Sequence, residues 1–111
     1  MEAEQAGDLD LALRALADSN RRAILAVIRS APSSVGALAE EVGLSQQTTS
    51  HHLGVLSTAG LVSGEREGTR HLFSVNTNGI AAVRSYLDDF WPSKLAALKA
   101  AVEDQRGEQR G

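Results

Sequence analysis

A tight turn at Gly43-Leu44 constrains the fold of this chain more than any other feature of its sequence. Before the turn, residues 35–42 (VGALAEEV) repeat apolar side chains at helical spacing, and Gly43 is suited to end such a helix. After the turn, Ser45 can cap a second helix that continues to about Ala59, where a glycine follows. Two helices joined by so short a connection, the second polar on one side, predict a helix-turn-helix.

Two further helices are expected before this unit. The first runs from about Asp8 to Leu16, and the second contains RRAILAVIRS, with Ser19 or Asn20 as its cap. Ser33 or Ser34 is expected to cap the helix over residues 35–42.

The region after the helix-turn-helix reads as a β-hairpin followed by a final helix. Leu61–Glu65 and His71–Val75 are the expected strands, around a Glu67-Gly68-Thr69 turn. The last helix is expected from about Thr77 to Glu103, with a kink or restart at Pro92.

The chain of 111 residues is long enough for one domain but not for two. We expect a flexible acidic N-terminus over residues 1–7, a single domain over residues 8–103 and a disordered tail over residues 104–111. The fold class is mainly α with a small β-hairpin, in the order α-α-α-α-β-β-α. Aliphatic side chains greatly outnumber the four aromatic ones, which also favours packed helices.

Composition excludes several classes of function. Because there is no cysteine, disulfides, zinc-thiolate sites and thiol nucleophiles are absent. No apolar run is long enough to span a bilayer, and MEAEQAGDLD does not resemble a signal peptide, so we expect a cytoplasmic protein without membrane contact. No nucleophile with a base, phosphate-cradling loop or convergent carboxylate pair is visible, so an enzyme is not expected.

The net charge of −3 argues against nucleic acid binding, which depends on Lys and Arg. The acidic residues are concentrated at the N-terminus, however, since residues 1–19 carry −4 and residues 20–76 carry +1. The middle of the chain can therefore still face DNA.

The adjacent histidines in the second helix of the helix-turn-helix are expected to point in different directions. Successive residues of a helix diverge by about 100°. If Thr49, Leu53 and Leu56 form the buried stripe, His51 lies on the opposite side and His52 lies on the flank of the stripe, partly buried. A shared metal site is then improbable, because helical metal pairs lie three or four residues apart.

Three segments together resemble the ArsR/SmtB-type winged helix-turn-helix transcriptional regulators of prokaryotes. They are DSNRRAILAVIRS, ALAEEVGLSQQTTSHHLGVLSTAGLV and REGTRHLFSV, within a resemblance that covers roughly Leu9 to Leu98. The resemblance implies a winged-helix fold and a homodimer that forms through the first and last helices. The dimer is expected to bind a near-palindromic promoter or operator in double-stranded DNA, usually as a repressor.

On this resemblance, the exposed side of the second helix of the motif is the DNA-reading surface. Its side chains carry amides, hydroxyls and an imidazole, which can form hydrogen bonds to bases and phosphates in the major groove. The residues are Ser45, Gln46, Gln47, Thr48, Ser50 and His51. The alternative is an ordinary solvated helix face. Gly54 departs from the family, which commonly has Lys or Arg there.

Four arginines outside this helix have two interpretations each. In the wing, Arg66 and Arg70 can contact phosphates or the minor groove, or can form surface ion pairs with Glu65 and Glu67. Arg21 and Arg22 can contact phosphates or remain solvated.

The first and last helices carry apolar residues that suit the implied dimer interface, which are Leu9, Leu13, Leu16, Phe90, Trp91, Leu95 and Leu98. The alternative is that both helices pack on the core of one subunit.

Many regulators of this type release DNA when a metal binds, but neither family ligand pattern is present, so no metal and no cofactor is predicted. Asp88 and Asp89 are expected to be solvated or paired with Arg84 or Lys94. Two alternatives to a simple DNA-binding regulator remain. One is a nickel-, cobalt- or zinc-responsive regulator that uses a non-standard site or a separate regulatory partner protein. The other is a winged-helix protein-interaction module.

Overall fold

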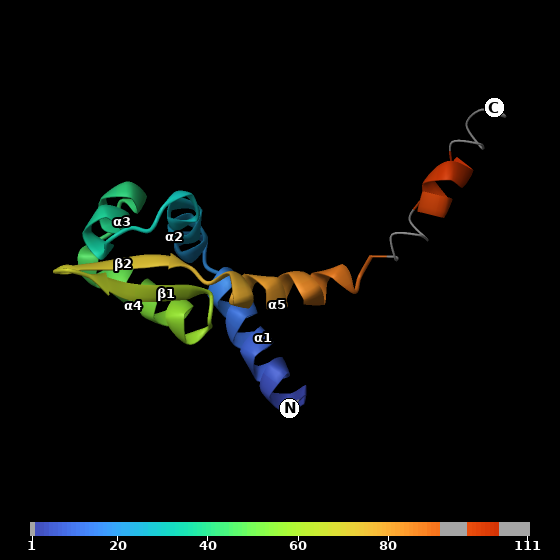
Figure 1. Ribbon diagram of the computed structural model, residues 1–111, viewed down its shortest axis with the longest axis horizontal. Helices are drawn as coiled ribbons and strands as arrows, with labels where there is room; N and C mark the ends of the chain where they lie inside the picture. The colour runs from blue at the N-terminus through green and yellow to red at the C-terminus, as the bar shows by residue number, and fades with distance from the viewer. Residues whose placement is uncertain (1, 92–97, 105–111) are drawn as a thin grey trace.

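The structure is a computed structural model that describes residues 2–91 and 98–104 (Figure 1). It contains seven named elements, which are α1 (Glu2–Leu16), α2 (Ser19–Ser30), α3 (Val35–Val42), α4 (Gln46–Thr58), β1 (Val62–Glu67), β2 (Arg70–Val75) and α5 (Thr77–Asp88). Residues 98–104 are also helical. The expected mainly α fold with one hairpin is confirmed, in the expected order. None of the helices in the described part is long and apolar enough to cross a membrane.

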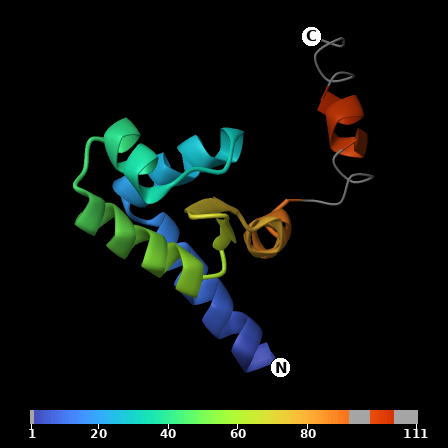
Figure 2. The same ribbon diagram turned by 60° about the vertical axis from the view of Figure 1, so that its left-hand side comes forward.

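The core lies where α2, α3 and α4 meet the base of the hairpin and the inner faces of α1 and α5. Its largest fully buried side chains are Ile24, Leu38, Leu53, Leu56, Leu61 and Thr49. The tip of the hairpin projects away from α5, and α1 passes beside the C-terminal end of α4 (Figures 1 and 2). The winged-helix unit is therefore held together at its centre, with the wing at one end.

Polar caps fix where the helices begin. Asp18 caps α2, since its carboxylate accepts hydrogen bonds from the backbone N–H of Asn20 (2.8 Å) and of Arg21 (3.1 Å). The expected cap, Ser19 or Asn20, was wrong because both residues already belong to the first turn. Ser34, one of the two expected residues, caps α3, and its hydroxyl accepts from the N–H of Ala37 at 3.2 Å.

The hairpin is longer than the sequence predicted. Val62 pairs with Val75 and Glu67 pairs with Arg70, which leaves a two-residue turn whose first residue, Gly68, has φ +65°. A glycine is favoured at that position because side chains rarely adopt positive φ. The loop before α3 also pairs with the wing, through hydrogen bonds between Ser33 and Phe73 of 3.0 and 2.8 Å.

The C-terminal end of α4 approaches the start of α5 closely. The N–H of Asn76, which caps α5, donates to the carbonyl of Leu61 at 2.9 Å. A Cβ added at Gly79 would overlap the carbonyl oxygen of Gly60. Gly79 therefore lets α5 lie directly against the backbone of the turn that follows α4.

The two terminal helices differ from expectation in their bounds. The first begins at Glu2 rather than near residue 8, so it includes part of the acidic segment. The last one ends at Asp88, and residues 98–104 form a separate helical segment. The turn at residues 89–91 fits the bias against helical conformation before a proline. Pro92 itself and the tail beyond residue 104 lie outside the described residues.

Candidate nucleic-acid interface

The N-terminal turn of α4 is ordered by its own polar side chains. The hydroxyl of Ser45 accepts a hydrogen bond from the N–H of Thr48 (3.1 Å) and donates to the Thr48 hydroxyl (2.9 Å). Both residues were predicted to contact DNA, and part of their hydrogen-bonding capacity is used in this cap. The Thr48 hydroxyl keeps its own proton available for a ligand.

The buried stripe of α4 sets the direction in which the exposed residues point. Thr49, Leu53 and Leu56 are 0%, 2% and 0% exposed, as predicted. The Thr49 hydroxyl donates to the carbonyl of Ser45 at 2.8 Å, which satisfies the one polar group of the stripe. The opposite face is solvated, with exposed side chains at Gln46, Gln47, Ser50 and His51.

The predicted division between the two histidines is confirmed. His51 is exposed, whereas His52 is 8% exposed and its Nδ1 lies 3.4 Å from Nη1 of Arg21. His52 therefore belongs to the contacts that hold α4 against α1 and α2. His51 remains available on the solvated face.

Gln46 differs from the other exposed residues of α4. A Cβ added at Gly36 would lie 3.2 Å from the Gln46 Nε2, so this side chain lies against α3. By contrast, Gln47, Ser50 and His51 are exposed on the solvated face, and their side chains make no hydrogen bond within the described residues.

Arg22 is exposed, as the solvated alternative expected, whereas Arg21 is half-buried, and both side chains bond the end of α1. Nε of Arg21 donates to the carbonyl of Ala15 at 2.7 Å, and Nη2 donates to that of Arg14 at 3.2 Å. Arg22 donates to the carbonyl of Leu16 at 2.8 Å. The last carbonyls of a helix lack helical partners, and these two arginines supply the donors for α1.

The wing presents two arginines near its tip. Arg66 is paired with His71 across the hairpin and Arg70 with Glu67, and both arginine side chains are exposed. Among residues 8–91 and 98–104, whose side chains the structure describes, the ion pair found joins Arg84 and Asp88 at 3.9 Å, which is one of the alternatives expected for Asp88. The ion pairs with Glu65 and Glu67 that were considered for Arg66 and Arg70 are not formed there, so both guanidinium groups are open to an anion.

Charge and helix direction favour an anionic partner at the start of α4. This helix (QQTTSHHLGVLST) contains no acidic residue, and its N-terminal N–H groups carry the positive end of the helix dipole.

Asp18, the cap of α2, has a shifted pKa. The N–H of Arg21 donates to its carboxylate and holds that pKa below its ordinary value of 3.8.

The residues predicted for the dimer interface divide into two groups. Leu9 and Leu16 are half-buried against their own core, as the single-subunit alternative expected. By contrast, Leu13, Phe90, Trp91 and Leu98 are 36%, 69%, 66% and 63% exposed. Leu95 lies outside the described residues. Four further apolar side chains are exposed that the predicted interface did not include, namely Leu11, Tyr86, Leu87 and Val102.

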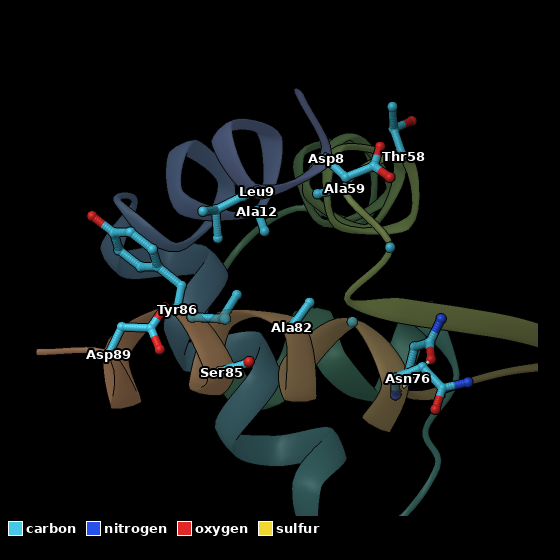
Figure 3. Close-up of a pocket in the computed structure, with 14 residues that line it drawn as sticks. Asp8, Leu9, Ala12, Thr58, Ala59, Asn76, Ala82, Ser85, Tyr86 and Asp89 are labelled. Atoms are coloured by element: carbon cyan, nitrogen blue, oxygen red, sulfur yellow. Dashed lines mark hydrogen bonds between the residues drawn. The ribbon is translucent and has the colours of Figure 1, made fainter. Parts of the chain in front are cut away.

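A pocket of about 680 Å³ lies between α1 and α5 on this apolar face (Figure 3). Tyr86 reaches from α5 toward α1 beside Leu9, and Asp8 and Asp89 lie at opposite ends of the pocket (Figure 3). The two carboxylates therefore do not converge on one ligand position. Within the described part of the chain, no three His, Cys, Asp or Glu side chains gather as a metal-binding group.

Known proteins share both the sequence pattern and the fold. Residues 16–65 match the family model described as a helix-turn-helix domain. The HTH-type transcriptional regulator Rv2034 of Mycobacterium tuberculosis is 38% identical over 96 residues, which cover 86% of this chain and 90% of that protein.

Two solved structures extend the likeness to the whole architecture. The homodimeric winged helix-turn-helix DNA-binding domain Mb0332 of Mycobacterium bovis is 29% identical, with a TM-score of 0.67 over 97% of this chain and 89% of that one. An ArsR-like transcriptional regulator from Rhodococcus sp. RHA1 is 26% identical, with a TM-score of 0.72 over 86% of this chain and 93% of that one.

Proposed function

Because the chain belongs to the ArsR family of winged helix-turn-helix transcriptional regulators, we propose that it binds a near-palindromic operator as a homodimer and represses transcription there. The observation that carries the proposal is the solvated face of α4. There Gln47, Ser50 and His51 project from a helix whose other side is fixed by a buried stripe.

In the proposed complex, α4 lies in the major groove. The Gln47 amide is suited to bond adenine through two hydrogen bonds, and the hydroxyl of Ser50 and the imidazole of His51 can bond bases or phosphates. Ser45, Gln46 and Thr48 lie at the N-terminus of α4, where the helix dipole favours a phosphate. Arg66 and Arg70 then contact the backbone or the adjacent minor groove through the wing.

The proposed dimer forms through the exposed apolar side chains of α1, α5 and the segment over residues 98–104. Leu13, Phe90, Trp91 and Leu98 leave large apolar surface in water, which is unfavourable in a monomer and typical of an interface. Tyr86 and Phe90 pack edge to face with ring centroids 5.2 Å apart, which gives this surface an ordered aromatic pair. The homodimeric state of the Mycobacterium bovis domain supports the proposal. A two-fold dimer places two α4 helices about one DNA turn apart and blocks a promoter that contains the site.

The test separates residues that read sequence from those that bind the backbone. The operators are selected from a randomised duplex library. Gln47→Ala and His51→Ala are each expected to lose about 1–3 kcal/mol of the preference for the selected base pair over other base pairs, at one position of each half-site. Arg70→Ala is expected to weaken binding to all duplexes about equally. Ser57→Ala, at an exposed position about two helical turns after Ser50 and not among the proposed DNA contacts, is the matched control. If all three variants bound like the parent chain, the proposed docking would be wrong.

A further inference from the structure

A second hollow, with a volume of about 520 Å³, lies between α1 and α4 and shares Thr58 and Ala59 with the pocket of Figure 3. Four residues of α4 line it, and their spacing of three, four and seven positions places them on one side of that helix: His51, Gly54, Val55 and Thr58. The groove therefore shares His51 with the face proposed to read DNA.

One end of this groove is cationic. Arg14, Arg21 and His51 line it, and no acidic residue does. Their proximity follows from three contacts: Nη2 of Arg21 is 3.2 Å from the carbonyl of Arg14, Nη1 is 3.4 Å from Nδ1 of His52, and the His51 and His52 ring centroids are 5.9 Å apart. The Arg14 guanidinium is exposed and makes no hydrogen bond or ion pair within the described residues.

The other end of the groove is apolar. Leu11, one helical turn before Ala15, is 41% exposed and lines the groove together with Val55 of α4 and Ala59, the residue that caps α4. At 1.5 Å per residue, the distance along α4 from His51 to Ala59 is about 12 Å. The groove thus offers positive charge at one end and an elongated apolar wall at the other.

We propose that this groove binds an amphipathic organic acid, with its carboxylate between Arg14 and His51 and its apolar body along Leu11, Val55 and Ala59. Arginine can bind a carboxylate through two parallel hydrogen bonds, and removal of water from the apolar wall is favourable. The bound acid lowers DNA affinity, because it engages His51 and adds negative charge beside the face that approaches the phosphates. Only this regulatory consequence rests on the proposed function.

Gly54 opens the groove. A Cβ added there would meet no atom within 4 Å, so the space above the α4 backbone is unfilled. A leucine at this position occupies that space, and it also raises helix propensity relative to glycine, so the variant is expected to fold. Gly54→Leu is therefore a way to close the site without damage to the core.

The experiment measures binding of decanoate to the full chain by isothermal titration calorimetry, below the concentration at which decanoate forms micelles. The parent chain is expected to bind decanoate but not decylammonium, which has the same tail and the opposite charge. Gly54→Leu is expected to weaken binding roughly tenfold or more, and Arg14→Ala about threefold to fivefold. Ser57→Leu, which adds the same side chain to α4 outside the groove, and Gly54→Ala, which adds one methyl, are expected to bind within about twofold of the parent.

A parallel titration of decanoate into the complex with a fluorescent operator duplex measures the regulatory step. Release of DNA from the parent by decanoate is the expected result. Failure of the parent to bind decanoate, or equal binding by Gly54→Leu, overturns the groove proposal even when DNA binding is intact. Decanoate binding without any DNA binding upholds the groove and refutes the proposed function. If Arg14→Ala binds DNA more weakly than the parent and the parent does not bind decanoate, the cationic end belongs to the DNA-backbone contact and the proposal is overturned.

Discussion

Replacement of Arg21 with methionine is expected to destabilise the fold more than the same replacement at its neighbour Arg22. Arg21 donates hydrogen bonds to the carbonyls of Ala15 and Arg14 and contacts His52, so its guanidinium joins α1, α2 and α4. Arg22 donates one hydrogen bond, to Leu16, at an exposed position. Methionine keeps the apolar stem in both variants and removes the same charge, so the pair isolates the contacts of Arg21.

The expected loss in free energy of unfolding follows from how deeply each hydrogen bond is buried. A hydrogen bond from a charged donor contributes about 1.5–3 kcal/mol, and the bond from Arg21 to Ala15 is partly buried. The bond to Arg14 is exposed and adds roughly 0.5–1 kcal/mol. We therefore expect Arg21→Met to lower the free energy of unfolding by about 2–4 kcal/mol, and Arg22→Met by about 0.5–1.5 kcal/mol.

Urea unfolding followed by far-ultraviolet circular dichroism measures this difference. All chains are compared at one protein concentration, since dimer formation makes stability depend on concentration. With a slope of roughly 1–3 kcal/mol per molar urea, the two variants should differ in midpoint by about 1 M. Equal losses for the two variants, or no loss for Arg21→Met, would show that the contacts of Arg21 do not hold the three helices together.

Three further predictions test the cap, the close packing and the dimer. Because the pKa of Asp18 is lowered, its contribution to stability is present above pH 3.8 and is lost as the pH falls through the folded-state value. Asp18→Asn should therefore flatten the dependence of unfolding free energy on pH below pH 3.8, and an unchanged slope would refute this. Gly79→Ala should lower the free energy of unfolding, because the added Cβ overlaps the carbonyl oxygen of Gly60. Ala82→Gly, in the same helix, should lower it by only about 1 kcal/mol, and a smaller loss for Gly79→Ala than for Ala82→Gly would contradict the close packing. Phe90→Glu should shift the chain toward monomer in sedimentation velocity, because a charge would be buried in the proposed interface. Its circular dichroism spectrum should be unchanged, since Phe90 is 69% exposed and outside the core, and a dimer as stable as that of the parent would contradict the proposed interface.

The helix-turn-helix could be predicted because its determinants are local. Gly43 has φ +72° and ends α3, and Ser45 caps α4, as the short turn required. The orientation of His51 and His52 followed from helical geometry alone, since a buried stripe fixes the rotation of the whole helix.

The features that could not be predicted from the sequence depend on contacts between helices that are distant in the chain or joined by an irregular turn. Arg21 bonds carbonyls six and seven residues earlier, across a turn whose geometry the sequence does not specify. The role of Gly79 depends on Gly60, which lies on a different element, so a single glycine in a helical pattern gave no sign of it. The DNA-contacting residues and the dimer interface remain predictions, because they concern surfaces whose partners lie outside one chain.

Fluorescence anisotropy with the duplex upstream of the gene that encodes this chain tests the central claim most directly. If Arg66 and Arg70 of two subunits contact four phosphates, the slope of log affinity against log salt is about −3.6, so affinity falls roughly 150-fold between about 50 and 200 mM salt. Tight binding at the lower concentration with a loss of this order is the predicted result. No binding at either salt concentration, or binding indifferent to salt, would contradict the assignment of α4 and the wing as a DNA-binding surface.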